Sequence, residues 1–295
     1  TRGTVLREEI SAVQEVTDLL TLDARHASRV APWSQFCHGL QGLETLGALR
    51  NSAGTEPNSL FDNSTVLKAL NSTNVWWLLT DGEISQGSIE RFSVNISRAR
   101  LHGKACVIIL FGHRKPKPED CNISVGVSLF ALVPDCLFLF HDVKTHEVFV
   151  LQSKGALGSI NNHQSVSQEI NDWTTWSDLK TIRYSDFGNI TIPEPAKLDA
   201  GEVMLQDGSK VSLAQLYRDE INGEQVRTIL GNDDNLNTVM LTATARGEAN
   251  LVEDWLKGQR RLPPEAINAY RVDVEKKAEH CQPYCRQAHE LWVSA

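Results

Sequence analysis

Two polar segments of the chain carry hydroxyl and carboxylate groups where a cation could bind. One is TDGE at residues 80–83, which directly follows a continuous apolar run. The other is SAGTE at residues 52–56, in a stretch rich in turn residues. Hydroxyl and carboxylate oxygens are the ligands that a hard cation such as Mg²⁺ prefers. If folding brings the two segments together, Thr55 and Asp81 are candidate Mg²⁺ ligands.

A second candidate metal site lies near the end of the chain, where Cys281, Cys285 and His289 follow at intervals of four residues. Thiolate sulfur and imidazole nitrogen are ligands of zinc. On a straight helix the two outer residues would be about 12 Å apart, which is hard to close on one tetrahedral ion. Pro283 can break the helix and relax this spacing. Zinc therefore stands as an alternative to a chance cluster on an amphipathic helix.

Motifs that identify common enzyme classes are absent from the sequence. It has no Gly-x-Gly-x-x-Gly after a strand, no phosphate-binding loop ending in Gly-Lys-Ser/Thr, no Gly-x-Ser-x-Gly and no His-Glu-x-x-His. No catalytic residue is therefore assigned. A doubly wound α/β enzyme, with a hydrolase as first candidate, is the alternative to a binding protein, because such sheets often host catalysis. Its candidate groups would be Cys37, Asp81, His113, His141 and Asp142.

The elements that must position these residues indicate an α/β domain. Apolar runs predict four strands, at residues 74–79, 105–111, 136–140 and 146–152. The first two runs are continuous, as in strands buried on both faces. Apolar positions with helical spacing lie between strands, at residues 87–101 and 123–133. This alternation predicts an open, mostly parallel sheet with helices on both faces and an antiparallel hairpin at one edge.

The rest of the chain divides around this sheet. We expect the α/β domain to span residues 1–152, with its first 50 residues partly helical, and a polar connector to span 153–195. Residues 196–295 are expected to form a hairpin and a smaller, mainly helical domain. Near the start, residues 5–20 predict a helix with one apolar face, formed by Leu6, Ile10, Val13, Thr17 and Leu20.

The run VWWLLTDGEI at residues 75–84 is preceded by SAGTEPNS and followed by a helix and a strand that ends at Gly112. Together these features resemble the central part of a von Willebrand factor A (vWA) domain. In that family a magnesium site called MIDAS combines an Asp-x-Ser-x-Ser motif, a threonine from a second loop and an aspartate from a Thr-Asp-Gly turn. The resemblance implies that Thr55 is this threonine and Asp81 this aspartate. It covers residues 50–155, about a third of the chain.

The first MIDAS element does not match the family pattern. Its nearest candidate begins at Asp23, but Arg25 and Ala27 stand where the motif has its two serines. Asp23 is also too close to Thr55 to leave room for the elements that intervene in the family. Either the first strand lies outside these residues or the site is degenerate. With both possibilities open, Asp23 joins Thr55 and Asp81 as the third candidate Mg²⁺ ligand.

Composition narrows the partners that this chain can have. Its 295 residues include 37 acidic and 29 basic ones, a net charge of −8, which argues against a nucleic-acid-binding surface. No apolar run is long enough to cross a membrane, and six cysteines are too few for a disulfide scaffold. We therefore expect an intracellular, cytoplasmic protein. The expected function is a protein-interaction module of the vWA type, in which Mg²⁺ could assist the binding of another protein at the carboxyl ends of the strands.

Overall fold

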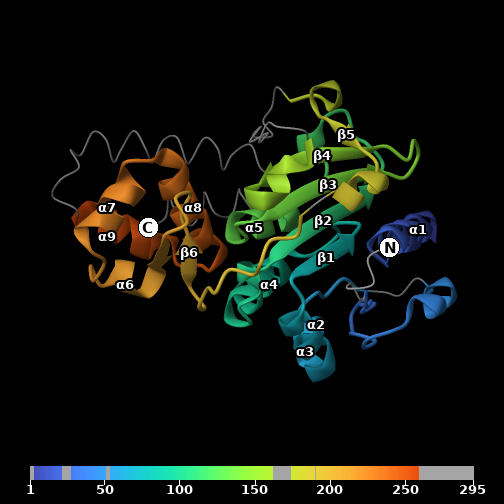
Figure 1. Ribbon diagram of the computed structural model, residues 1–295, viewed down its shortest axis with the longest axis horizontal. Helices are drawn as coiled ribbons and strands as arrows, with labels where there is room; N and C mark the ends of the chain where they lie inside the picture. Colours follow the sequence, from blue (N-terminus) through green and yellow to red (C-terminus); the bar gives the residue numbers. More distant parts are fainter. Residues whose placement is uncertain (1–2, 22–27, 51–53, 162–173, 190, 259–295) are drawn as a thin grey trace.

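The computed structural model describes residues 3–21, 28–50, 54–161, 174–189 and 191–258 (Figure 1). A five-stranded sheet and the helices around it form an α/β unit, and a group of helices follows toward the C-terminus. This arrangement confirms the predicted α/β class and the helical C-terminal part. Within these ranges no helix has the length and apolarity that a membrane crossing requires.

The sheet has the strand order β1-β2-β3-β4-β5. Its strands are β1 (Val75–Thr80), β2 (Ala105–Gly112), β3 (Cys136–Asp142), β4 (Val148–Lys154) and β5 (Thr181–Ile182). The pairs β1–β2 and β2–β3 are parallel, whereas β3–β4 and β4–β5 are antiparallel. The sheet is therefore mixed rather than mostly parallel, because the segment predicted as a connector adds β5 and a second antiparallel pair.

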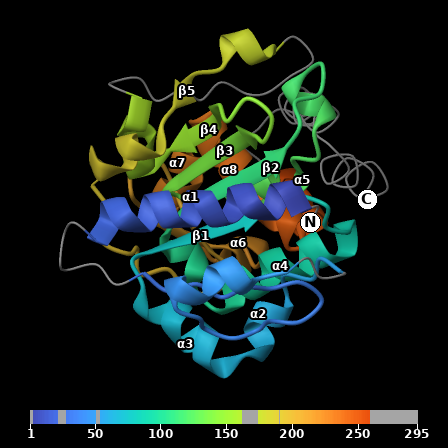
Figure 2. The same ribbon diagram turned by 90° about the vertical axis from the view of Figure 1, so that its right-hand side faces the viewer.

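Helices cover both faces of the sheet. On one face, α4 (Gln86–Arg98) and α5 (Ser124–Leu132) pack into a core with alternate side chains of β1, β2 and β3. On the other face lies α1 (Gly3–Thr21), which crosses in front of the strands in Figure 2 and contacts the 3₁₀ helix η6 (Tyr184–Asn189). Because successive side chains of a strand point to opposite faces, the central strands supply both cores.

The chain between α1 and β1 forms short elements beside the first strand: η1 (Leu43–Ala48), α2 (Ser59–Asp62) and α3 (Ser64–Ser72). Asn63 separates α2 from α3 because its backbone is extended and its side-chain oxygen caps the first turn of α3. The remaining 3₁₀ turns are η2 (Leu101–Gly103), η3 (Pro118–Asp120), η4 (Gly155–Asn161) and η5 (Trp176–Asp178).

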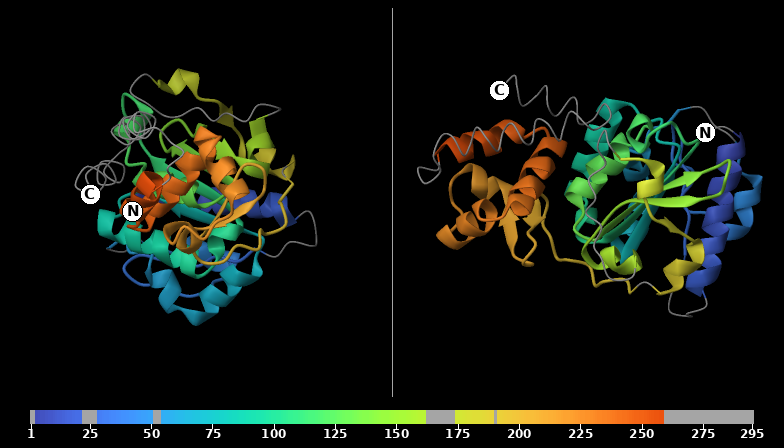
Figure 3. Two further views of the ribbon diagram at one scale, coloured as in Figure 1. Left: turned by 90° about the vertical axis from the view of Figure 1, so that its left-hand side faces the viewer. Right: turned by 90° about the horizontal axis from the view of Figure 1, so that it is seen from above.

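The C-terminal part has an apolar core of its own. Its elements are β6 (Glu202–Met204), β7 (Lys210–Ser212), α6 (Leu213–Tyr217), α7 (Gly223–Leu230), α8 (Asp233–Ala245) and α9 (Ala249–Gly258). Of these, α8 packs against α5, as the right-hand view of Figure 3 shows. Arg246, just after α8, donates a hydrogen bond of 2.9 Å to the Ser97 hydroxyl of α4. The predicted hairpin is confirmed, while further helices predicted after residue 258 lie outside the described residues.

Candidate functional site

β1 is an edge strand with one open side. It pairs with β2 in parallel register, from Val75 opposite Ala105 to Thr80 opposite Leu110. On its other side, no strand of the described chain pairs with it. Backbone N–H and C=O groups of a strand point to both sides, so β1 presents a row of donors and acceptors there. Its sequence, VWWLLT, places no charge along this edge.

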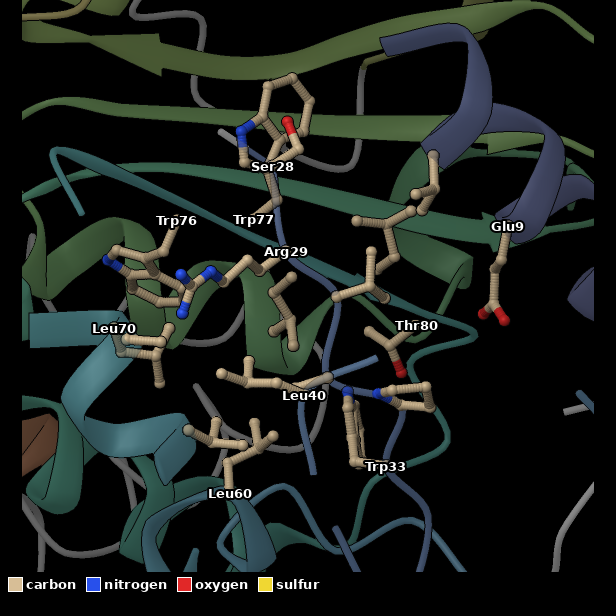
Figure 4. Close-up of a pocket in the computed structure, with 18 of the residues that line it drawn as sticks. Glu9, Ser28, Arg29, Trp33, Leu40, Leu60, Leu70, Trp76, Trp77 and Thr80 are labelled. Atoms are coloured by element: carbon tan, nitrogen blue, oxygen red, sulfur yellow. The ribbon is translucent and has the colours of Figure 1, made fainter. Parts of the chain in front are cut away.

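A cavity of about 850 Å³ runs along the open side of β1. Every residue from Val75 to Thr80 contributes to its wall, and α1, α3 and the segment 28–34 supply much of the rest. The side chains drawn in Figure 4 are mostly apolar and include Trp33, Leu40, Leu60, Leu70, Trp76 and Trp77. Binding sites in proteins typically enclose roughly 300–1,000 Å³, so this cavity has the size of a ligand site.

The cavity explains why β1 is less covered than its sequence predicts. Trp76, Leu78 and Thr80 are buried, whereas Val75, Trp77 and Leu79 are only half-buried. The prediction that this run is buried on both faces is therefore wrong for one face. A continuous apolar run is typical of a central parallel strand, but β1 lies at the edge of the sheet and one of its faces is incompletely covered.

The apolar face of α1 predicted from the sequence lines the cavity, while a neighbouring set of side chains packs into the sheet core. The residues of α1 in the sheet core are Val5, Ala12 and Val16. The predicted apolar stripe instead lines the cavity, through Leu6, Ile10, Val13 and Thr17. The two stripes are neighbours because successive residues of a helix are about 100° apart. α1 therefore packs on the sheet beside the cavity and contributes side chains to both.

Acidic groups lie toward one end of the cavity. Glu9 of α1 and Thr80 at the end of β1 line it there, as Figure 4 shows, and Asp81 follows directly. Burial, together with the negative charge of Asp81, raises the pKa of Glu9 to about 8. At neutral pH the Glu9 carboxyl therefore tends to keep its proton. A bound cation at this end would favour the ionised form of Glu9.

The turn after β1 holds Asp81 at the carboxyl end of the strand. Gly82 has a φ of 76°, and a Cβ atom at this position would lie 2.6 Å from the carbonyl oxygen of Asn122. The turn therefore requires glycine. The Asp81 carboxylate accepts a hydrogen bond of 3.3 Å from the backbone N–H of Glu83.

The loop that carries Thr55 reaches the start of α4 through Glu56. The Glu56 carboxylate accepts hydrogen bonds from the Ser88 hydroxyl at 2.8 Å and from Arg91 at 3.0 Å. Burial opposes the ionisation of Glu56, but hydrogen bonds from Asn58, Ser88 and Arg91 outweigh it and lower its pKa. The two predicted loops are thus linked through Glu56 and α4, while Thr55 lies in the cavity wall.

The other predicted ligands are not in the part of the chain that the structure describes. Asp23 lies in the gap between residues 21 and 28. Cys281, Cys285 and His289, the alternative zinc ligands, lie beyond residue 258. Of the three residues proposed for Mg²⁺, only Thr55 and Asp81 therefore have a described position.

The candidate groups of the enzyme alternative are held by separate partners. The Asp142 carboxylate binds Arg114 at 2.7 Å at the end of β3. Nδ1 of its neighbour in β3, His141, lies 2.7 Å from the Tyr184 hydroxyl. Cys37 Sγ accepts a backbone hydrogen bond within its own loop. His141 and Asp142 are thus adjacent at the end of β3, where each binds a different partner, and Cys37 belongs to a separate loop.

A group of possible metal ligands that the sequence analysis missed lies beside α1. It consists of Glu8, His141 and His146. His141 lies in β3 and His146 lies just before β4, so the two histidines are close in sequence. This spacing could have suggested a metal site from the sequence alone. Glu8 and His146 are 138 residues apart, so only the folded chain brings the carboxylate to them.

Comparison with known proteins shows that part of this chain is similar in sequence to a viral protein. No family model matches it, and no solved structure matches it. It is 29% identical over 161 residues to a protein of Acanthamoeba polyphaga mimivirus described as "Uncharacterized protein R626". The match covers 52% of this chain and 26% of the viral protein. This chain is therefore similar, over about half its length, to about a quarter of that viral protein.

Proposed function

We propose that this chain is a protein-interaction module of the vWA type that binds an extended segment of a partner protein along the open side of β1. The observation that carries the proposal is the 850 Å³ cavity beside the unpaired edge of an uncharged strand. Exposed edges usually carry charges, proline or a bulge that prevents pairing with another strand. The sequence of β1 has no proline and no charged side chain, which favours strand addition.

An added strand would bind both through its backbone and through its side chains. Its backbone would pair with the outward-facing donors and acceptors of β1, which contributes affinity without regard to sequence. Its alternate side chains would enter the parts of the cavity on either side of the sheet plane. Trp33, Leu40 and Leu60 make one region apolar, so the partner segment should carry large apolar residues at alternate positions.

Mg²⁺ at the acidic end of the cavity is the second part of this proposal. Asp81 would supply a carboxylate ligand, Thr55 a hydroxyl ligand and Glu9 a further carboxylate. The raised pKa of Glu9 supports this assignment because the charge of Asp81 contributes to it, so the two carboxyl groups are near enough to interact. A carboxylate of the partner segment could complete the coordination of the ion.

A peptide selection with matched variants tests the binding site. A library of random decapeptides displayed on phage is selected on the wild-type chain, and the affinities of enriched peptides are measured by fluorescence polarisation. In Leu79→Lys a cation enters the cavity beside the edge, so we expect roughly a tenfold loss or more, about 1.4 kcal/mol. Leu230→Lys makes the same change at a half-buried position of α7 and should bind like wild type. Equal binding by both variants would contradict the proposal.

The expectation of an intracellular location also stays a proposal. It is supported by the thiols of the described chain, since Cys37, Cys106, Cys121 and Cys136 are all free. Disulfides persist in oxidising compartments and are rare in the cytosol. The protein can be isolated without reductant, unfolded in denaturant and labelled with a thiol reagent. The number of labels then counts the free cysteines.

A further inference from the structure

Glu8, His141 and His146 bring three ligand atoms together at one end of the sheet. Glu8 comes from the second turn of α1, His141 from β3 and His146 from the turn before β4. The Glu8 Oε2 atom lies 3.0 Å from His146 Nδ1 and 3.4 Å from His141 Nε2. All three ligand atoms lie within 4.8 Å of one another. Two ligands of one tetrahedral zinc ion, at bond lengths of about 2.0–2.1 Å, are about 3.3 Å apart, so the two distances from Glu8 are already close to those of a zinc site.

A buried nitrogen without a hydrogen bond points into this group. The His141 side chain is only 5% exposed, and its Nε2 atom makes no well-formed hydrogen bond, with the Glu8 carboxylate 3.4 Å away. A buried polar atom in this state normally signals a missing ligand or water. The opposite nitrogen, Nδ1, is fixed at 2.7 Å from the Tyr184 hydroxyl, and the ring stacks on Phe111 at 4.9 Å. The imidazole is thus held from behind while Nε2 faces Glu8 and His146.

Tyr184 is placed to orient the His141 ring as a metal ligand. Metal binds the neutral form of imidazole, so ligation through Nε2 would leave the proton on Nδ1. Nδ1 would then donate a hydrogen bond to the Tyr184 hydroxyl oxygen, 2.7 Å away. A hydrogen bond from the second nitrogen of a ligating histidine to a neighbouring oxygen fixes the orientation of the ring.

We propose that Glu8, His141 and His146 bind Zn²⁺, with Tyr184 orienting His141, and that the ion fastens α1 to the β3–β4 hairpin. Two imidazole nitrogens favour a transition metal over Mg²⁺ or Ca²⁺, which prefer oxygen ligands. Three protein ligands leave one position of a tetrahedral ion for water. His146 is 65% exposed and Glu8 23% exposed, so the ion can enter from solvent.

The test uses the chain of 295 residues with Cys281→Ser and Cys285→Ser, so that the other possible zinc ligands near the C-terminus lose their thiols. This parent protein is freed of metal with EDTA and titrated with ZnCl₂ by calorimetry. We expect one Zn²⁺ per chain, and at least roughly a tenfold weaker affinity in His146→Ala, which loses a ligand. His113→Ala removes an exposed histidine outside the group and should leave the affinity within about twofold of the parent.

Two further readouts separate loss of a ligand from loss of the fold. His146 is exposed, so His146→Ala should keep the circular dichroism of the metal-free parent, while loss of the contact with Glu8 at 3.0 Å can lower its melting temperature without metal. Zn²⁺ should raise the melting temperature of the parent and of His113→Ala but not of His146→Ala, because a ligand that binds only the folded state stabilises it. Tyr184→Phe should weaken the affinity by roughly tenfold through loss of orientation. Absence of Zn²⁺ uptake by the parent, or equal affinities of His146→Ala and His113→Ala, would overturn the proposal.

Discussion

Burial and the charge of Asp81 together raise the pKa of Glu9 to about 8, so these two carboxyl groups act on each other across the acidic end of the cavity. Glu9 comes from α1, and Asp81 comes from the turn that ends β1. The charges of these two groups would repel each other if both were ionised. A divalent cation between them would remove this repulsion.

Asp81→Ala is expected to abolish Mg²⁺ binding, because the substitution removes the carboxylate ligand at the end of β1. Calorimetric titration with MgCl₂ compares wild type, Asp81→Ala and Asp254→Ala, a control that removes a 70% exposed carboxylate of α9. The control should bind Mg²⁺ like wild type. If wild type takes up no Mg²⁺, the proposed role of the metal is wrong. The proposal that β1 binds a partner strand is tested separately, by the peptide selection.

Gly82→Ala is expected to destabilise the fold by roughly 1–3 kcal/mol, because alanine is strained at a positive φ and its Cβ would collide with Asn122. Urea unfolding at fixed pH gives the change in the free energy of unfolding. Gly87→Ala is the matched control: Gly87 lies in the first turn of α4, where a Cβ meets only the end of Arg91. This control should be neutral or stabilising by up to about 1 kcal/mol. Equal destabilisation of both variants would show that the turn does not require glycine.

His102 is expected to make the protein less stable as the pH falls below neutral. His102 belongs to η2, its side chain is buried, and Nε2 lies 3.1 Å from the Asp199 carbonyl oxygen in the segment before β6. Burial lowers its pKa below the ordinary value of 6.5. Below pH 6.5 the unfolded chain therefore takes up a proton more readily than the folded chain. The contribution of His102 to stability is complete above that pH and is lost as the pH falls toward the lower, folded-state pKa.

His102→Gln isolates this contribution because glutamine does not titrate in that range. The free energy of unfolding should fall more steeply with decreasing pH in wild type than in the variant, by up to about 1.4 kcal/mol per pH unit. Urea unfolding curves between neutral pH and moderately acidic pH provide the comparison. Parallel stability profiles for the two proteins would mean that His102 keeps its ordinary pKa in the folded state.

Sequence analysis found the central elements because their signals are local. Apolar runs ended by Gly82 and Gly112 marked β1 and β2, and the spacing of Ile89, Phe92 and Ile96 marked α4. Turn residues similarly marked the β6–β7 hairpin at Asp207-Gly208. In each case a short stretch of chain determines its own conformation, so the pattern alone was sufficient.

Features that depend on the neighbours of an element were not predictable in this way. The run that forms β1 has the composition of a central strand, and only the strand order shows that it lies at the edge. Periodicity identified α1 as amphipathic, but two adjacent stripes, one starting at Val5 and one at Leu6, fit the pattern almost equally well. The meeting of Glu8 with His141 depends on how α1 crosses the sheet, which no local signal encodes.

The most direct test of the central claim is hydrogen exchange of the backbone amides in β1, measured residue by residue by NMR with and without a selected peptide. In the free protein, the amides from Val75 to Thr80 that point away from β2 should exchange faster than those that pair with it. Saturating peptide should slow exchange at these outward amides, with little change in the amides of β7, in the C-terminal part. Unchanged exchange at the outward amides of β1, with the peptide bound, would contradict strand addition at this edge.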